Sequence, residues 1–149
     1  AASDVYKRQV WIGCDDLYLP RALSGWEDWD VDVVSFGLRA IPGSWELVRS
    51  APTMAEVFAA DTGNLVACGS PFRRRLWEGQ PFTTDSFPFN DWAFWISCAG
   101  QGARFGATGR VDFLYRVHPA QVRIPDEPLL TQIKLWRDLS APQWAGVPA

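Results

Sequence analysis

Residues 31–41, "VDVVSFGLRAI", predict a β-strand that is followed by a turn. The stretch is rich in β-branched residues, and "PGS" (42–44) follows it directly as a turn signal. We expect "WELVRSA" (45–51) to continue this strand or to pair weakly with it. A strand of this kind needs further strands beside it and helices over it, so the flanking sequence decides the fold class.

The flanking segments predict further strands. "VWIGCDD" (10–16) is an apolar run that ends in two acids, which is typical of a buried strand opening into a site. "LYLPRALSGW" (17–26) is expected to turn into a short helix. "LVACGSPFRRRLWEG" (65–79) is expected to begin as a strand and become helical after Pro71. "ARFGATGRVDFLYRVH" (103–118) predicts two strands joined by a glycine turn.

Three further stretches predict helices. Thr53 and Glu56 form a capping-box pattern at the start of residues 53–61. In residues 91–102, "DWAFWISCAGQG", apolar side chains recur at i, i+3, i+4 and i+7, which gives one apolar helical face. Residues 125–141 predict a last helix with acids in its first turn. The alternation of strands and helices predicts an α/β fold with a mixed sheet and flanking helices.

Composition limits the classes of function. The 149 residues fit one domain, and a net charge of −3 argues against a nucleic-acid partner. Three widely spaced cysteines and one histidine argue against a structural zinc site or a disulfide framework, and they indicate a reducing, cytoplasmic setting. No apolar run is long enough to predict a transmembrane segment. Nine tryptophans exceed what a core of this size needs, so some are candidates for a sugar-binding wall.

The first residues look foreign to the fold. "AASDVYKRQ" (1–9) lacks an initiator methionine, and the methionine of this chain is Met54. We therefore interpret residues 1–9 as a non-native scar and set them aside. The remaining chain divides into 10–122, which carries the candidate motifs, and 123–149, a C-terminal helix and tail.

Asp15 and Asp16 are the first candidate site. Adjacent carboxylates after a buried strand suit Mg²⁺ or Mn²⁺, which bind one or two anionic oxygens and take other ligands from water and phosphate. Ligands of open α/β sheets also bind at the carboxyl ends of strands. A solvated turn or a helix N-cap explains the pair nearly as well.

Three more residues have two interpretations each. Asp91 opens a helix, where a carboxylate can cap the free N–H groups or act as a general base. His118 ends a strand and is either a metal or phosphate ligand or a half-buried imidazole with ordinary hydrogen bonds. Arg116 could pair with phosphate oxygens, although a strand arginine is usually a surface residue.

Together these motifs resemble, in order and spacing, the second half of an inverting family 2 glycosyltransferase of the GT-A fold. The matching segments are "CDDLYLPRAL", "DVVSFG", "GSPFRRRLWE", "FNDWAFWISCAGQGARF" and "FLYRVHPAQV". They resemble the family's Asp-x-Asp strand, its small-residue strand with "F-R-R-x-x-W", its "E-D-W-x-x-W" helix and its "Y-R-x-H" strand. The resemblance implies a partial, Rossmann-like GT-A fold over residues 10–122, with the N-terminal nucleotide-binding half missing.

The resemblance also implies roles and partners. The partners would be a nucleotide-sugar donor and a sugar or lipid-linked acceptor, with the enzyme cytoplasmic or peripheral at the inner membrane face. The chain alone would be inactive. The residues concerned are Asp91 as catalytic base, Asp15, Asp16 and His118 at a Mg²⁺ or Mn²⁺ ion, Trp92 as a wall of the acceptor site, and Arg116 and Arg73 as donor or acceptor contacts.

Two positions depart from the family pattern. Gly13 stands where the first acid of Asp-x-Asp is common, and Asn90 replaces the usual glutamate before Asp91. These departures leave two other functions open. One is a non-catalytic carbohydrate-binding module in which tryptophans form a sugar platform, and the other is a degenerate structural module.

Overall fold

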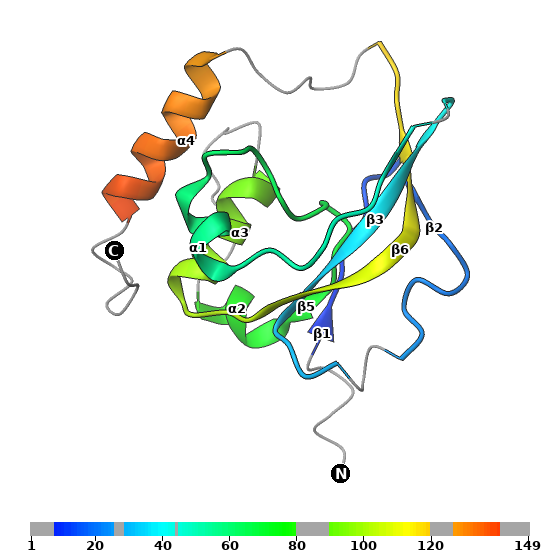
Figure 1. The fold of residues 1–149 in the computed structure, drawn as a ribbon, viewed down its shortest axis with the longest axis horizontal. Helices are drawn as coiled ribbons and strands as arrows, with labels where there is room; N and C mark the ends of the chain where they lie inside the picture. Colours follow the sequence, from blue (N-terminus) through cyan, green and yellow to red (C-terminus); the bar gives the residue numbers. More distant parts are fainter. Residues whose placement is uncertain (1–7, 26–28, 44, 80–89, 120–126, 141–149) are drawn as a thin grey trace.

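The computed structural model describes residues 8–25, 29–43, 45–79, 90–119 and 127–140. They form a mixed α/β fold in which a curled sheet carries its helices on one face (Figure 1). The predicted fold class, a mixed sheet with flanking helices, is thereby confirmed. Among the residues described here, no helix has the length and apolar character needed to cross a membrane.

Two long parallel strands form the centre of the sheet. Strand β3 (Val33–Ile41) pairs with β6 (Phe105–Arg116), and the strand order is β1-β5-β3-β6-β2. The other strands are two-residue segments that pair antiparallel: β1 (Arg8–Gln9), β2 (Leu17–Tyr18), β4 (Glu46–Leu47) and β5 (Phe72–Arg73). The strand predicted at 31–41 and the weak pairing predicted for 45–51 are both confirmed.

A bulge, rather than a turn, lies within β6. Ser35 pairs with Ala107 and Gly37 with Val111, so β6 contains two extra residues between these pairs. Gly109 has φ 68° there, and a side chain on Gly37 would place its Cβ 2.3 Å from the carbonyl oxygen of Arg110. The prediction of two strands in 103–118 was therefore wrong, because the glycine bends one continuous strand.

The central helix is buried on nearly all sides. Helix α3 (Asn90–Gly100) is buried from Trp92 to Gly100, although the sequence predicted a single apolar face. One side packs with Val33 and Phe72 of the sheet, and the other side packs under the last helix. A helix covered on two faces needs apolar residues all round. The shorter helices are α1 (Met54–Ala59), with its predicted capping box present, and α2 (Arg74–Gly79).

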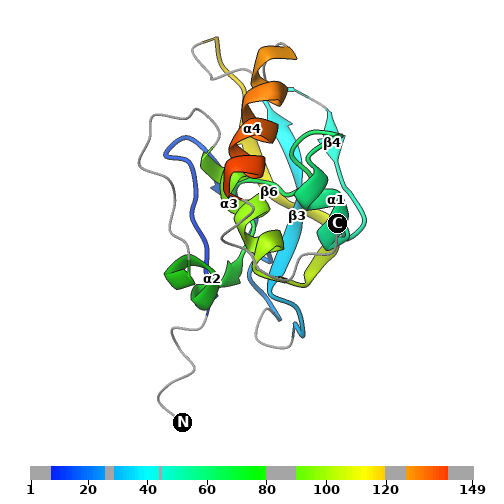
Figure 2. The same ribbon diagram turned by 90° about the vertical axis from the view of Figure 1, so that its left-hand side faces the viewer.

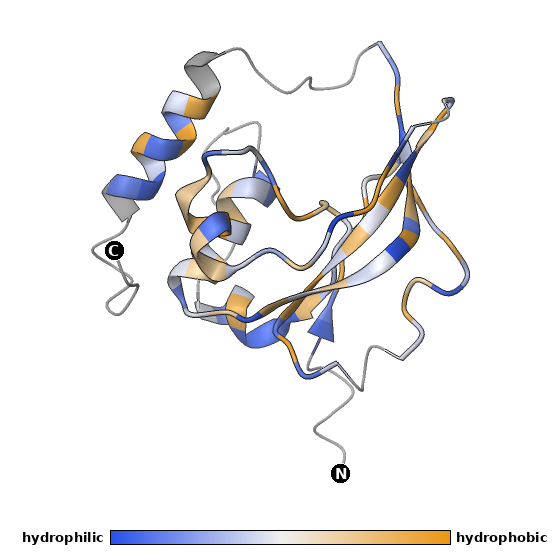
Figure 3. Cartoon of the chain, in the orientation of Figure 1, coloured by the Kyte–Doolittle hydropathy of each residue, from blue (hydrophilic) through white to orange (hydrophobic). Residues whose placement is uncertain are grey.

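Helix α4 (Glu127–Ser140) forms a third layer outside α3 (Figure 2). Ile133 is fully buried and packs against Trp92 and Ile96 of α3. Arg137 donates from Nη1 to the carbonyl of Ala59 at 2.5 Å, at the end of α1. The helix carries hydrophobic and hydrophilic residues together (Figure 3), as a helix with one covered face requires.

Three predicted elements differ from the observed ones. Residues 10–16 are not a strand, because no strand among the described residues lies beside them and Trp11 instead stacks on Trp95 at 5.2 Å. The described part of the helix predicted at 17–26, residues 17–25, starts with β2 and continues as turns, since its first residues pair with β6. In 65–79 the strand begins later than the sequence predicted and covers only Phe72–Arg73. Arg8–Gln9, set aside from the sequence, forms β1 beside β5.

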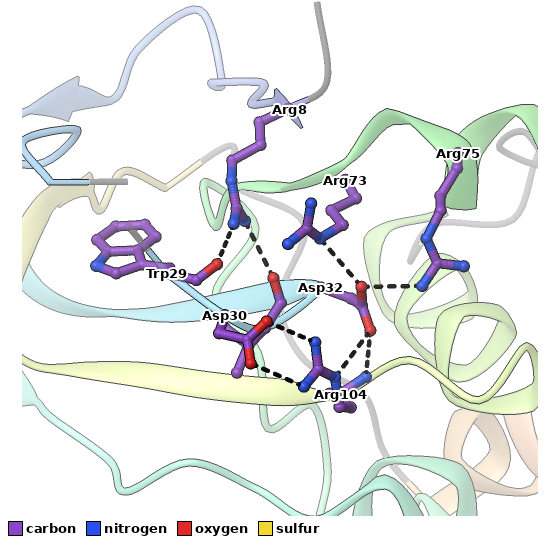
Figure 4. Close-up of polar contacts among 8 residues, drawn as sticks. Arg8, Trp29, Asp30, Asp32, Arg73, Arg75 and Arg104 are labelled. Carbon is purple, nitrogen blue, oxygen red and sulfur yellow. Dashed lines mark hydrogen bonds and ion pairs between the residues drawn. The ribbon is translucent and has the colours of Figure 1, made fainter. Parts of the chain in front are cut away.

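One buried carboxylate, that of Asp32, ties together the start of the two central strands (Figure 4). Its Oδ1 lies 2.9 Å from Nη2 of Arg75 and 3.2 Å from Nε of Arg73. Its Oδ2 accepts the backbone N–H of Arg104 at 2.9 Å, just before β6. Arg8 completes the cluster by donating to the carbonyl of Val31 at 3.2 Å.

The ionised form of Asp32 is stabilised despite its burial. Burial alone would raise the pKa of Asp32, but hydrogen bonds from the Arg104 N–H and the Arg75 guanidinium, with the charges of both arginines, lower it below its usual value. A lowered folded-state pKa contributes stability above the unfolded value, and that stability is lost as the pH falls through the folded value.

We expect Asp32→Asn to lower the free energy of unfolding at pH 7 by about 2 kcal/mol, because arginines lose their counter-ion but stay in contact with water. The difference from the parent protein should begin to shrink below about pH 4, the pKa of an aspartate in the unfolded chain, and should be lost as the pH falls through the lower folded-state pKa of Asp32. Urea unfolding at several pH values measures both effects. Asp30→Asn is the matched control, because Asp30 is exposed and should change stability little. A pH-independent difference would contradict the account.

Candidate functional site

The sequence-predicted acids Asp15 and Asp16 lie in a turn beside the carboxyl end of β6. The N–H of Asp16 donates to the carbonyl of Gly13 at 3.1 Å, which closes the turn. At the end of β6 the N–H of Arg116 donates to Oδ1 of Asp16 at 2.8 Å, and its Nε donates to the carbonyl of Asp15 at 2.8 Å. Pairing of β2 with β6 holds the turn in this place.

His118 joins the same cluster two residues beyond β6. Its Nε2 lies 3.0 Å from Oδ2 of Asp15, and both side chains remain partly exposed. The structure therefore brings together Asp15, Asp16, Arg116 and His118, all of which the sequence singled out. Asp16 is the buried member, and burial raises its pKa against the opposing hydrogen bond from Arg116.

The absence of a side chain at Gly13 is explained by the position of the Asp16 carboxylate. A Cβ added to Gly13 would lie 2.7 Å from Oδ2 of Asp16, which is closer than non-bonded atoms approach. The carboxylate of Asp16 thus occupies the space beside residue 13. The first acid that the Asp-x-Asp pattern would place at residue 13 is absent, and the carboxylate of Asp16 fills the space beside it.

Asp91 lies in the first turn of α3, half-buried. Nδ2 of Asn64 donates to its Oδ2 at 2.9 Å. Burial raises the pKa of Asp91, and this effect outweighs hydrogen bonds from the backbone N–H groups of Trp92 and Asp91 and from Asn64. A carboxylate with a raised pKa binds a proton more readily, which suits a general base.

The turn that carries Asp15 and Asp16 is called the acid turn below. Cys68 and Tyr115 link it to Asp91, because the carboxylates on both sides act on these two residues. Burial, together with the negative charges of Asp91 and Asp16, raises the pKa of Cys68 to about 12. Burial also raises the pKa of Tyr115, with further contributions from Cys68 and from the carboxylates of Asp16, Asp91 and Asp15. The three carboxylates therefore act on one shared region around Cys68 and Tyr115.

Two residues that the sequence assigned to the site, Trp92 and Arg73, lie away from the acid turn. Trp92 is 2% exposed and packs with Ile96 and Ile133 under α4, so in this arrangement it is a core residue and offers no wall to an acceptor. Arg73 pairs with Asp32 at the start of β3, whereas the acid turn lies at the far end of the central strands. Nine strand residues span roughly 26 Å, so the structure does not bring Arg73 to the site.

Four residues of this region were missed from the sequence: Asn64, Cys68, Tyr115 and Trp45. Trp45 is 50% exposed, and its ring centroid lies 6.5 Å from that of Tyr115. An exposed aromatic beside the acids is a suitable surface for a sugar ring. The available sequence signal was "PGS" (42–44), which predicts a turn before Trp45. In the structure the N–H of Ala40, which pairs with Tyr115, donates to the carbonyl of Trp45 at 3.0 Å.

Comparisons with protein-family models, with curated proteins and with solved structures find no match to this chain. Within the described parts of the chain, no group of three or more histidine, cysteine or acidic side chains is arranged to hold a metal ion. Mg²⁺ commonly takes only one or two protein carboxylates and completes its shell with water and phosphate. The oxygens of Asp15 and Asp16 fit that smaller requirement, since both are hard anionic ligands on one turn.

The shared region can be tested through the thiol of Cys68. We expect iodoacetamide to modify exposed Cys14 much faster than Cys68 at pH 9, because little Cys68 thiolate forms far below its pKa. Asp91→Asn should speed the modification of Cys68 by removing a nearby negative charge. Peptide mass spectrometry measures each rate.

Asp61→Asn serves as the control, since Asp61 is an exposed acid paired with Lys134. An equal effect of both substitutions on Cys68 would show that Asp91 does not face the shared region.

Proposed function

We propose that this chain is the acceptor-side part of an inverting, metal-assisted glycosyltransferase that moves a sugar from a nucleotide-sugar donor to a hydroxyl acceptor. The observation that carries the proposal is that Asp91, a carboxylate of raised pKa, and the turn of Asp15 and Asp16 both act on Cys68 and Tyr115. One group able to accept a proton and two able to hold a cation are what this reaction needs. The order of motifs in the sequence supports the same class.

The acid turn would bind the diphosphate end of the donor. Asp15 and Asp16 would hold Mg²⁺ or Mn²⁺, and the bound cation would neutralise the charge that develops on the leaving diphosphate. His118 contacts Asp15 at 3.0 Å and so orients that carboxylate. Arg116 lies close enough to offer a guanidinium to phosphate oxygens beside its contact with the Asp15 carbonyl.

Asp91 would supply the base. In this account its carboxylate removes the proton from an acceptor hydroxyl as that oxygen attacks the anomeric carbon from the face opposite the leaving group. The hydrophobic surroundings that raise its pKa make proton transfer more favourable near neutral pH. The exposed ring of Trp45, next to Tyr115, would support the acceptor sugar in the place that the sequence assigned to Trp92.

A non-catalytic carbohydrate-binding module is the second candidate, and exposed Trp45 favours it. The two functions differ in their need for a metal. A module binds sugar through aromatic surface with or without a divalent cation, whereas the transferase binds a nucleotide diphosphate only with one. Calorimetric titration with and without Mn²⁺ separates them.

The base is tested by Asp91→Asn in the full-length protein. Asparagine still accepts the hydrogen bond from Asn64 and the helix N–H groups, so a stabilising contribution of about 1 kcal/mol should largely remain. It cannot take the acceptor proton, so turnover should fall by at least about 10². Turnover and melting temperature are the measurements. A loss of stability with turnover per folded molecule unchanged would reduce Asp91 to a structural cap.

The cation ligands are tested by Asp15→Ala. Its partly exposed side chain contributes little packing, so the melting temperature should hold while Mn²⁺-dependent binding of a nucleotide diphosphate is lost. Asp61→Ala provides a control with an exposed acid that pairs with Lys134 of α4 instead of contacting the turn. Metal-dependent binding that survives Asp15→Ala would contradict the assignment.

A further inference from the structure

We propose that Asn64 is a positioning residue that fixes the orientation of the Asp91 carboxylate. The inference rests on the proposed function, because it gives Asn64 a role in placing the base of that reaction. The direct observation is the 2.9 Å hydrogen bond from Nδ2 of Asn64 to Oδ2 of Asp91, which joins the loop after α1 to the first turn of α3.

The orientation of the Asn64 amide is set by the backbone. Its Oδ1 accepts the N–H of Val66 at 3.3 Å. A backbone N–H can only donate, so the oxygen of the amide must face Val66 and the NH₂ group must face Asp91. The amide therefore presents a donor to the carboxylate in one orientation, and a rotated amide would lose both hydrogen bonds.

The loop that carries Asn64 is held by the core. Val66 is 1% exposed and belongs to the apolar cluster that includes Val33 of β3 and Phe94 of α3. The carbonyl of Leu65 accepts a hydrogen bond from Ser35 Oγ on the central strand at 3.5 Å. Asn64 is thus attached to the same framework that carries Asp91, and its donor is pre-organised.

The chemistry of the contact explains why a donor is needed. Burial favours the protonated form of Asp91, and a base must be ionised to accept a proton. The titratable groups that share this region, Cys68 and Tyr115, have raised pKa values and are neutral near pH 7, and the carboxyl groups of Asp15 and Asp16 act on the same region. The NH₂ group of Asn64 stabilises the ionised form and holds one oxygen in place, which leaves the remaining lone pairs to face the acceptor.

Asn64→Asp is the sharpest test, because aspartate keeps the shape and still accepts from the N–H of Val66. The substitution replaces the NH₂ group that donates to Asp91 with a negatively charged oxygen. Asn64→Leu removes both hydrogen bonds and serves as a second variant if the first is unstable. Gln101→Leu is the matched control, since Gln101 donates its amide to the carbonyl of Leu76 at the opposite end of α3.

The first measurement needs no turnover: the pKa of Asp91, followed by carbon-13 NMR of the side-chain carboxyl in this chain. We expect both Asn64 variants to raise it and Gln101→Leu to leave it unchanged. The second measurement is the pH profile of kcat/KM in the full-length protein. Its acid limb should move to higher pH in Asn64→Asp, with kcat at pH 7 reduced about tenfold and the KM for the donor unchanged.

The results separate the two proposals. A raised pKa of Asp91 in a protein with no transferase activity would support the role of Asn64 and end the proposed function. Turnover that depends on Asp91, together with an Asp91 pKa and a pH profile untouched by both Asn64 variants, would overturn the positioning role. An equal effect of Gln101→Leu would also overturn it, because the cause would then be general loosening of α3.

Discussion

The carboxylate of Asp32 is the contact on which the arrangement of the central strands depends. It is buried directly before β3, and its partners come from β5, from α2 and from the residue before β6. Three segments distant in the sequence, around residues 32, 73–75 and 104, are thereby fixed at one end of two parallel strands. Since β3 and β6 resume their pairing beyond the bulge and continue to Ile41 and Arg116, the position of their far ends follows from this anchor, and the acid turn is built on that far end.

Asp32 and Asp91 show how hydrogen-bond donors decide whether a carboxyl group in the protein is ionised. Asp32 is less exposed than Asp91, yet its pKa is lowered because arginines and a backbone N–H surround it. Asp91 has no charged donor among the partners that act on it, and its pKa is raised. One acid is thus held ionised for structure, and the other is prepared to bind a proton. The same type of side chain therefore takes opposite pKa shifts in its two environments.

Local sequence signals predicted much of this structure. The β-branched run of 31–41, the capping box at Thr53 and the helical period after Asp91 each gave the correct element, because each depends on nearby residues. The strand predicted at 10–16 failed because a strand needs a neighbour in space. The bulge at Gly109 was mistaken for a turn, since local sequence does not show that β3 pairs on both sides of it. Among site residues, Asp15, Asp16, Arg116 and His118 came together as predicted, while Asn64 and Tyr115 required the tertiary contacts.

The central claim is that Asp91 and the acid turn share one site, and paramagnetic broadening by Mn²⁺ tests it most directly. In an assigned amide NMR spectrum, Mn²⁺ added with a nucleoside diphosphate should broaden Asp15, Asp16 and His118 first, and then Cys68, Tyr115 and Asp91. The amides of Asp30 and Arg104, at the opposite end of the central strands, should stay sharp, and Asp15→Ala should abolish the broadening. Broadening that reaches Arg104 before Asp91, or that persists in Asp15→Ala, would contradict the account.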